Sequence, residues 1–139
     1  ALLKARLAVE QRHQVAVAKI EYERRTLEER IRAQQGMISD GKQEVRSGLI
    51  GAVDAQGLRH HASASLHLMR QAQRLVLELH GVHHRMEAAR QELVEAAKAR
   101  RAVELLRDRR WEEWKVAEDK IEVAALDELA VIAAARGST

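Results

Sequence analysis

A repeating spacing of apolar residues in the second half of the chain constrains the fold more than any other feature. The residues follow one another at alternating steps of four and three: Leu68, Ala72, Leu75, Leu79, Val82, Met86, Ala89, Leu93 and Ala96. Such a run covers about four heptads, the length at which a helix is expected to pack as a coiled coil. Because the chain has no proline, no residue forces such a helix to break.

An earlier helix is predicted over residues 2–47, where helix-forming residues predominate and no glycine occurs before Gly36. Apolar residues recur at roughly helical spacing: Leu3, Leu7, Val17, Ile20, Leu27 and Ile31. Polar residues interrupt this stripe at Glu10, His13 and Arg24, so we expect an imperfect packing surface.

The chain is expected to reverse direction in a glycine-rich turn over residues 48–57. Five of its seven glycines lie between Gly36 and Gly57, and each interior glycine weakens a helix. A second helix is then predicted over residues 58–136. The predicted fold is all-α, with two long helices in an antiparallel coiled-coil hairpin that forms a single unit over residues 1–139.

The hairpin should leave the end of the second helix without an intramolecular partner. With the turn near residues 48–57, positions that face each other sum to about 105, which places Leu3 opposite Ala102. Everything beyond Val103 then overhangs by some 33 residues, or roughly 50 Å. Residues 116–132 are more apolar than a solvated helix requires. This excess predicts either a docking rod for a partner or a dimer interface.

The heptad register is expected to loosen after Ala96, where an arginine cluster begins. A strict continuation would place Arg100, Arg107 and Arg110 on the packing face, whereas apolar residues drift to other positions, among them Leu105, Leu106, Trp111 and Trp114. Two interpretations of the arginines stay open. They form a solvated face paired with acids such as Glu104, or they bind carboxylates on a partner protein.

Trp111 and Trp114 lie three residues apart, on one side of the predicted helix. Because they fall in the overhang, they would have to pack against a partner, and tryptophan is enriched at binding hot spots. Both residues are therefore candidates for partner binding.

Other classes of function find little support. We find no catalytic motif and no phosphate-binding loop, so we expect no enzyme and no cofactor. His80, His83 and His84 have a spacing that could hold a metal, but they fall on the solvent side of the heptad, which favours surface histidines and no metal site. Acids interrupt the basic residues and no aromatic stacking platform accompanies them, which disfavours nucleic acid.

No apolar run approaches the roughly 18 residues of a membrane span. The start of the chain has no signal-peptide pattern, so a cytoplasmic location is expected.

The run from Glu104 through Leu106, Arg107 and Arg110 to Trp114, followed by Leu126-Asp127-Glu128-Leu129-Ala130, resembles the C-terminal helix of the FliJ family. The opening Leu2-Leu3-Lys4-Ala5-Arg6 with Glu10 is similar to the N-terminal helix of that family. The resemblance covers both helices.

The resemblance implies a component of the bacterial flagellar type III export apparatus, a two-helix coiled coil shaped like the shaft of a rotary ATPase. It implies three partners, which are the hexameric export ATPase, the export gate protein and export chaperones. It also implies a place at the inner face of the cell membrane, reached only through partners. Partner-binding residues are then expected in the arginine cluster and beyond: Arg100, Arg101, Glu104, Leu106, Arg107, Arg110, Trp111, Trp114, Leu126, Asp127, Glu128 and Leu129.

Three alternatives to the flagellar stalk stay open. The chain could be a structural homodimer with paired overhangs, a stalk protein of a virulence-type secretion system, or a basic coiled coil that binds nucleic acid.

Overall fold

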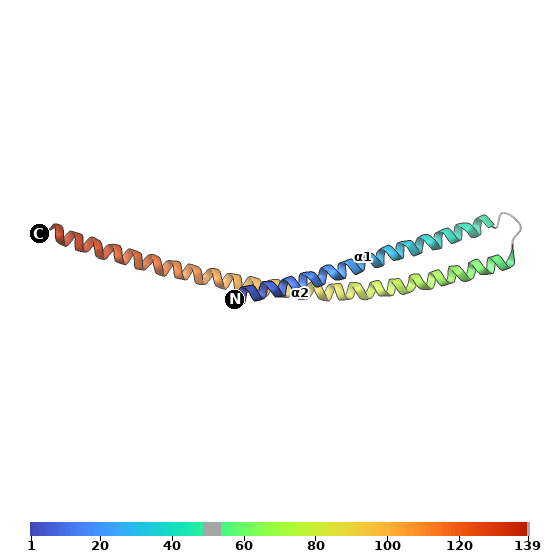
Figure 1. Cartoon of the computed structure of the whole chain (residues 1–139), viewed down its shortest axis with the longest axis horizontal. Helices are drawn as coiled ribbons and strands as arrows, with labels where there is room; N and C mark the ends of the chain where they lie inside the picture. Colours follow the sequence, from blue (N-terminus) through green and yellow to red (C-terminus); the bar gives the residue numbers. More distant parts are fainter. Residues whose placement is uncertain (49–53, 139) are drawn as a thin grey trace. The chain divides into compact units, whose positions relative to one another are not determined.

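The computed structural model describes residues 1–48 and 54–138, and within these ranges it contains two α-helices and no strand. Helix α1 spans Leu2–Gly48 and helix α2 spans Ala55–Gly137 (Figure 1). Contacts divide the chain into two units. One comprises Gln11–Glu95, and the other comprises Ala1–Glu10 together with Ala96–Thr139.

In the unit Gln11–Glu95, α1 and α2 run antiparallel. His13 Nδ1 lies 3.6 Å from Glu92 Oε2, Arg85 Nη2 lies 2.9 Å from Glu23 Oε2, and Gln34 contacts Gln71. The partner positions on α2 fall as those on α1 rise, which requires opposite directions. The predicted all-α antiparallel hairpin is confirmed.

The face of α2 that packs on α1 is the face predicted by the 4-3 spacing. All the predicted positions from Leu68 to Ala96 are buried or half-buried. The best-buried side chains lie in the middle of the run, where Val82 is 2% exposed and Met86 is 3% exposed. We refer to this face, with the face of α1 against it, as the seam.

The seam of α1 keeps the same 4-3 spacing but includes polar residues. It runs through Glu10, His13, Val17, Ile20, Arg24, Leu27, Ile31, Gln34, Ile38, Gly41 and Val45, none of which is exposed. The seam positions include Glu10, His13 and Arg24, the polar residues that were expected to interrupt the apolar stripe. Leu7 was predicted to lie on the stripe, and this was wrong: Leu7 does not fall on the 4-3 spacing that leads to Glu10 and His13, and it is 45% exposed.

Gln34 is the buried polar residue of α1, with 9% of its surface exposed. Its side-chain Nε2 donates to the backbone oxygen of Leu68 at 3.2 Å and to Oε1 of Gln71 at 2.8 Å. A buried amide that finds its partners in only one alignment favours that alignment over its slipped alternatives. Gln34 therefore helps to set how the two helices are aligned.

Helix α2 begins at Ala55, earlier than the predicted Leu58, because Asp54 caps it. Asp54 Oδ1 accepts a hydrogen bond of 3.0 Å from the backbone nitrogen of Gln56, and Asp54 O accepts one of 2.9 Å from that of Leu58. An N-terminal aspartate satisfies amide groups that the first turn leaves open. Gly48, predicted to start the turn, ends α1, and turn residues 49–53 lie outside the described residues. The prediction of one folding unit stays a prediction.

Replacing Met86 by alanine should destabilise the hairpin by about 2–5 kcal/mol, because the substitution leaves a cavity in the best-packed part of the seam. The matched control is Met37→Ala, since Met37 is 55% exposed and its loss should cost under about 0.5 kcal/mol. Urea unfolding followed by circular dichroism measures both variants. Equal losses would mean that the seam is not the main source of stability.

Candidate protein-binding surface

A network of charged groups holds the end of the seam in the unit formed by Ala1–Glu10 and Ala96–Thr139. Arg100 Nε donates to Oε2 of Glu10, and Arg100 Nη1 lies 2.9 Å from Oε1 of Glu104. Arg101 Nη1 donates to the other carboxylate oxygen of Glu104 at 3.2 Å. Arg100 thus connects α1 to α2 across the seam.

The register was expected to loosen after Ala96, and this was wrong as far as Val103. Ala96, Arg100 and Val103 continue the 4-3 spacing and are all half-buried. Arg100 can occupy a seam position because Glu10 on α1 supplies the opposite charge. Two of the predicted partner-binding residues, Arg100 and Glu104, therefore form ion pairs within the chain itself.

The ion pairs around Arg100 shift the pKa values of Arg100 and Glu104. The hydrogen bond from Arg100, followed by the one from Arg101, lowers the pKa of Glu104 below its ordinary value of 4.5. The hydrogen bonds to Glu104 and then Glu10 raise the pKa of Arg100. These hydrogen bonds therefore stabilise the charged forms of Glu104 and Arg100.

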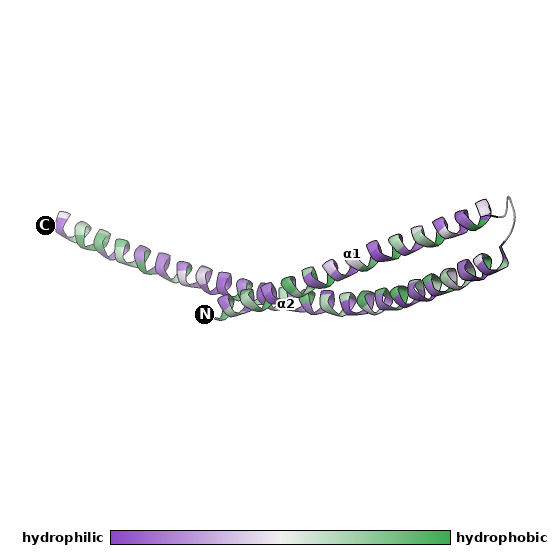
Figure 2. Ribbon diagram, turned by 45° about the vertical axis from the view of Figure 1, so that its right-hand side comes forward, coloured by the Kyte–Doolittle hydropathy of each residue, from purple (hydrophilic) through white to green (hydrophobic). Residues whose placement is uncertain are grey.

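Beyond the network, α2 continues without cover from α1. Every described residue from Leu105 onward is exposed. We call residues 105–137 the free segment; the coloured ribbon in Figure 2 shows hydrophobic residues toward its C-terminal end. Trp111 is 54% exposed and Trp114 is 59% exposed, and Lys115 Nζ lies 5.2 Å from the centre of the Trp111 ring.

Helical spacing sorts the predicted binding residues of the free segment onto different faces. Trp111, Trp114 and Leu129 share one face, and Arg107 and Arg110 lie on or beside it. Glu128 lies at the edge of the same face, whereas Leu106, Leu126 and Asp127 fall on other sides of the helix.

The face that carries Trp111 and Trp114 also includes three residues that were not predicted to bind a partner: Ile121, Ala125 and Ile132. Counting about 100° per residue from Trp111 would have found them, because all three fall within about 80° of it around the helix.

The exposed arginines differ in whether they form ion pairs within the chain. Arg101 pairs with Glu104, and Arg107 Nη2 lies 3.8 Å from Oδ1 of Asp108, yet the side chains of both arginines stay more than half exposed. Arg110 forms no ion pair with any residue that the structure describes. These three guanidinium groups are accessible to a partner.

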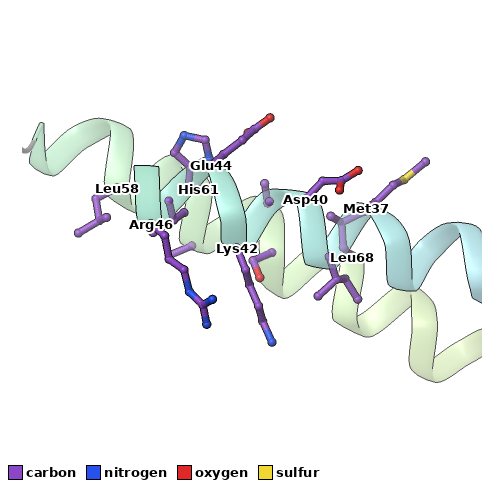
Figure 3. A pocket seen from close by; sticks show the side chains of 14 residues that line it. Met37, Asp40, Lys42, Glu44, Arg46, Leu58, His61 and Leu68 are labelled. Carbon is purple, nitrogen blue, oxygen red and sulfur yellow. The ribbon is translucent and has the colours of Figure 1, made fainter. Parts of the chain in front are cut away.

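A groove of about 610 Å³ lies between α1 and α2 near the turn, in the unit Gln11–Glu95 (Figure 3). Met37, Val45, Leu58 and Leu68 give it an apolar lining. Small residues line it too, among them Gly41, Ala62 and Ser65, and their size leaves the space open.

Neither a metal site nor a membrane span is found in the described parts of the chain. They contain no group of three or more His, Cys, Asp or Glu side chains that could hold a metal ion. Their helices also include none that is long and apolar enough to cross a membrane.

The network around Arg100 predicts a loss of stability in acid. Because the folded pKa of Glu104 lies below 4.5, its stabilising effect is present above that pH and is lost as the pH falls through the folded value. We expect Glu104→Gln to reduce the fall in thermal stability between about pH 5 and pH 3. Glu112→Gln is the control, because Glu112 is exposed and forms no ion pair among the described residues. Identical pH profiles for both variants would contradict the role of the network.

The chain matches one protein family along its whole length. The model of that family, described as flagellar FliJ protein, covers residues 1–139. No curated protein and no solved structure matches the chain. The family match spans both helices of the hairpin and the free segment. The chain belongs to the FliJ family, whose members are components of the bacterial flagellar type III export apparatus.

Proposed function

We propose that this chain is a non-enzymatic central stalk that regulates the export ATPase ring and escorts export chaperones. The observation that carries the proposal is the free segment, an exposed helix bearing two tryptophans in a chain of the flagellar export family. A long helix without tertiary packing is only marginally stable in water. A partner that covers the free segment would stabilise it.

A ring suits the free segment because apolar residues lie on all of its sides. Trp114 and Leu129 lie on one face, while Val123 and Leu126 lie elsewhere on the helix, and all four are more than half exposed. A flat partner would cover only one of these faces. A helix with side chains is about 10–12 Å wide, and a channel that surrounds it can contact every face at once.

In this proposal Arg101, Arg107 and Arg110 bind acidic loops of the ring, because the planar guanidinium pairs well with carboxylates. Arg100 and Glu104 have another role: Arg100 pairs with Glu10 across the seam and with Glu104 on α2, and these contacts mark where the free segment begins. Asp127 and Glu128 lie in the Leu-Asp-Glu-Leu ending that resembles the family, and neither forms an ion pair with another described residue.

The export gate protein and export chaperones are the further partners of the proposal. The chain would act in the cytoplasm and meet the inner face of the membrane only through them. We propose no binding of nucleic acid, no cofactor and no metal. The flagellar family match favours this role over a virulence-type secretion stalk.

Charge reversal tests the arginines. The variant Arg101→Glu, Arg107→Glu and Arg110→Glu should abolish the increase in ATP hydrolysis that the chain causes in a flagellar export ATPase from the same organism, because like charges repel the acidic loops. The matched control reverses Arg32, Arg70 and Arg74, which are exposed residues of the other unit. Unchanged stimulation by the first variant would rule out the arginine contacts.

The affinity of the chain for the ATPase tests whether the tryptophans contact it. Replacing both Trp111 and Trp114 by alanine should weaken binding to the ATPase by about 2 kcal/mol or more, since exposed tryptophans at an interface act as hot spots. Titration calorimetry measures this change. Leu77→Ala is the control, because Leu77 is exposed but lies in the hairpin. Equal affinities for the double variant and the unchanged chain would contradict a contact at the tryptophans.

A further inference from the structure

One face of the free segment carries an apolar stripe that is interrupted by Glu118. Its members are Trp111, Trp114, Ile121, Ala125, Leu129 and Ile132. With about 100° of turn per residue they fall within an arc of about 80°, as narrow as a coiled-coil seam. All are exposed, so nothing in the described chain packs on them.

Basic and acidic residues occupy separate parts of α2 from residue 100 onward. Residues 100–110 contain five arginines and two acids, whereas residues 112–128 contain seven acids and two lysines. On or beside the stripe, Arg107 and Arg110 lie toward its basic end and Glu128 toward its acidic end. Two copies in parallel would place like charges together, while two antiparallel copies would place opposite charges together.

We propose that the apolar stripe binds the same stripe of a second copy of this chain, with the two helices antiparallel and centred near residue 118. Facing positions on the stripe then sum to 235 or 236, because the two helices run in opposite directions. Trp114 lies opposite Ile121, and Trp111 lies opposite Ala125. Pairing a large residue with a small one lets the two helices interdigitate.

The same alignment brings the charged ends together twice. Arg107 of each copy lies opposite Glu128 of the other, and Arg110 lies within one helical turn of it. Glu118 meets its own counterpart at the centre, which is the one unfavourable contact on the stripe. This contact weakens the self-pairing, so Glu118→Leu should strengthen it.

This inference goes beyond the proposed function and does not depend on it. A stripe that is paired with a second copy cannot contact a ring at the same time. Self-pairing would hold free chains in reserve and release them when a partner competes for the stripe.

Sedimentation velocity of the full chain, without any ATPase, tests the proposal. The unchanged chain should form a dimer. The variant Arg107→Glu and Arg110→Glu, and separately Glu128→Arg, should each raise the dimer dissociation constant by about tenfold or more, because each puts like charges together at both ends. An equimolar mixture of the two variants should restore the dimer, since every reversed charge then meets an opposite one.

The control is a mixture of the unchanged chain with the Arg107→Glu and Arg110→Glu variant. An antiparallel dimer predicts weaker mixed pairing than in the unchanged chain, whereas a parallel dimer predicts stronger mixed pairing. Circular dichroism verifies that each variant remains helical. A chain that stays monomeric, with or without Glu118→Leu, would overturn the proposal. So would a mixture of the two charge-reversed variants that fails to pair, or stronger pairing in the control.

Discussion

The seam between α1 and α2 is the constraint on which the rest of the structure depends. A single helix in water gains little stability from its own hydrogen bonds, so each helix needs a face to bury. On α2 the most buried part of that face is formed by Val82, Met86 and Ala89. On α1 the buried apolar side chain is that of Leu27. Because the seam ends at Val103 and Glu104, it also determines which part of α2 remains available to partners.

Polar residues give the seam its alignment at some cost in stability. Gln34 binds Leu68 and Gln71 across the helices, and Arg100 binds Glu10 near the end of the seam. Apolar residues in their places would pack in more than one register. A two-helix coiled coil has few long-range contacts, so a handful of such bonds can choose one alignment among many. The position at which the free segment begins follows from that choice.

Much of the fold was predictable because the heptad repeat is a strong local signal. The run from Leu68 to Ala96 gave the seam of α2, and its pairing with α1 gave the exposed free segment. The position of Arg100 was not predictable in the same way. A charged residue on a packing face looks like a break in the pattern until its partner, Glu10, is placed opposite it.

The binding surface was only partly predictable. The two tryptophans stand out in a chain with a single other aromatic residue, Tyr22. Ile121, Ala125 and Ile132 are ordinary residues within an apolar stretch, and only their placement on the helix relative to Trp111 assigns them to its face. Leu126 is similarly apolar, yet the same geometry places it outside the stripe. Composition therefore identified the segment, while helical geometry identified the face.

We propose that the chain joins the export apparatus through the free segment of α2. Hydrogen–deuterium exchange of the full chain, with and without the hexameric export ATPase, tests it most directly. We expect that adding the ATPase slows amide exchange across residues 105–132 and leaves exchange in the unit Gln11–Glu95 unchanged. Slower exchange confined to the unit Gln11–Glu95 would rule out a contact at the free segment and place the contact on the paired helices.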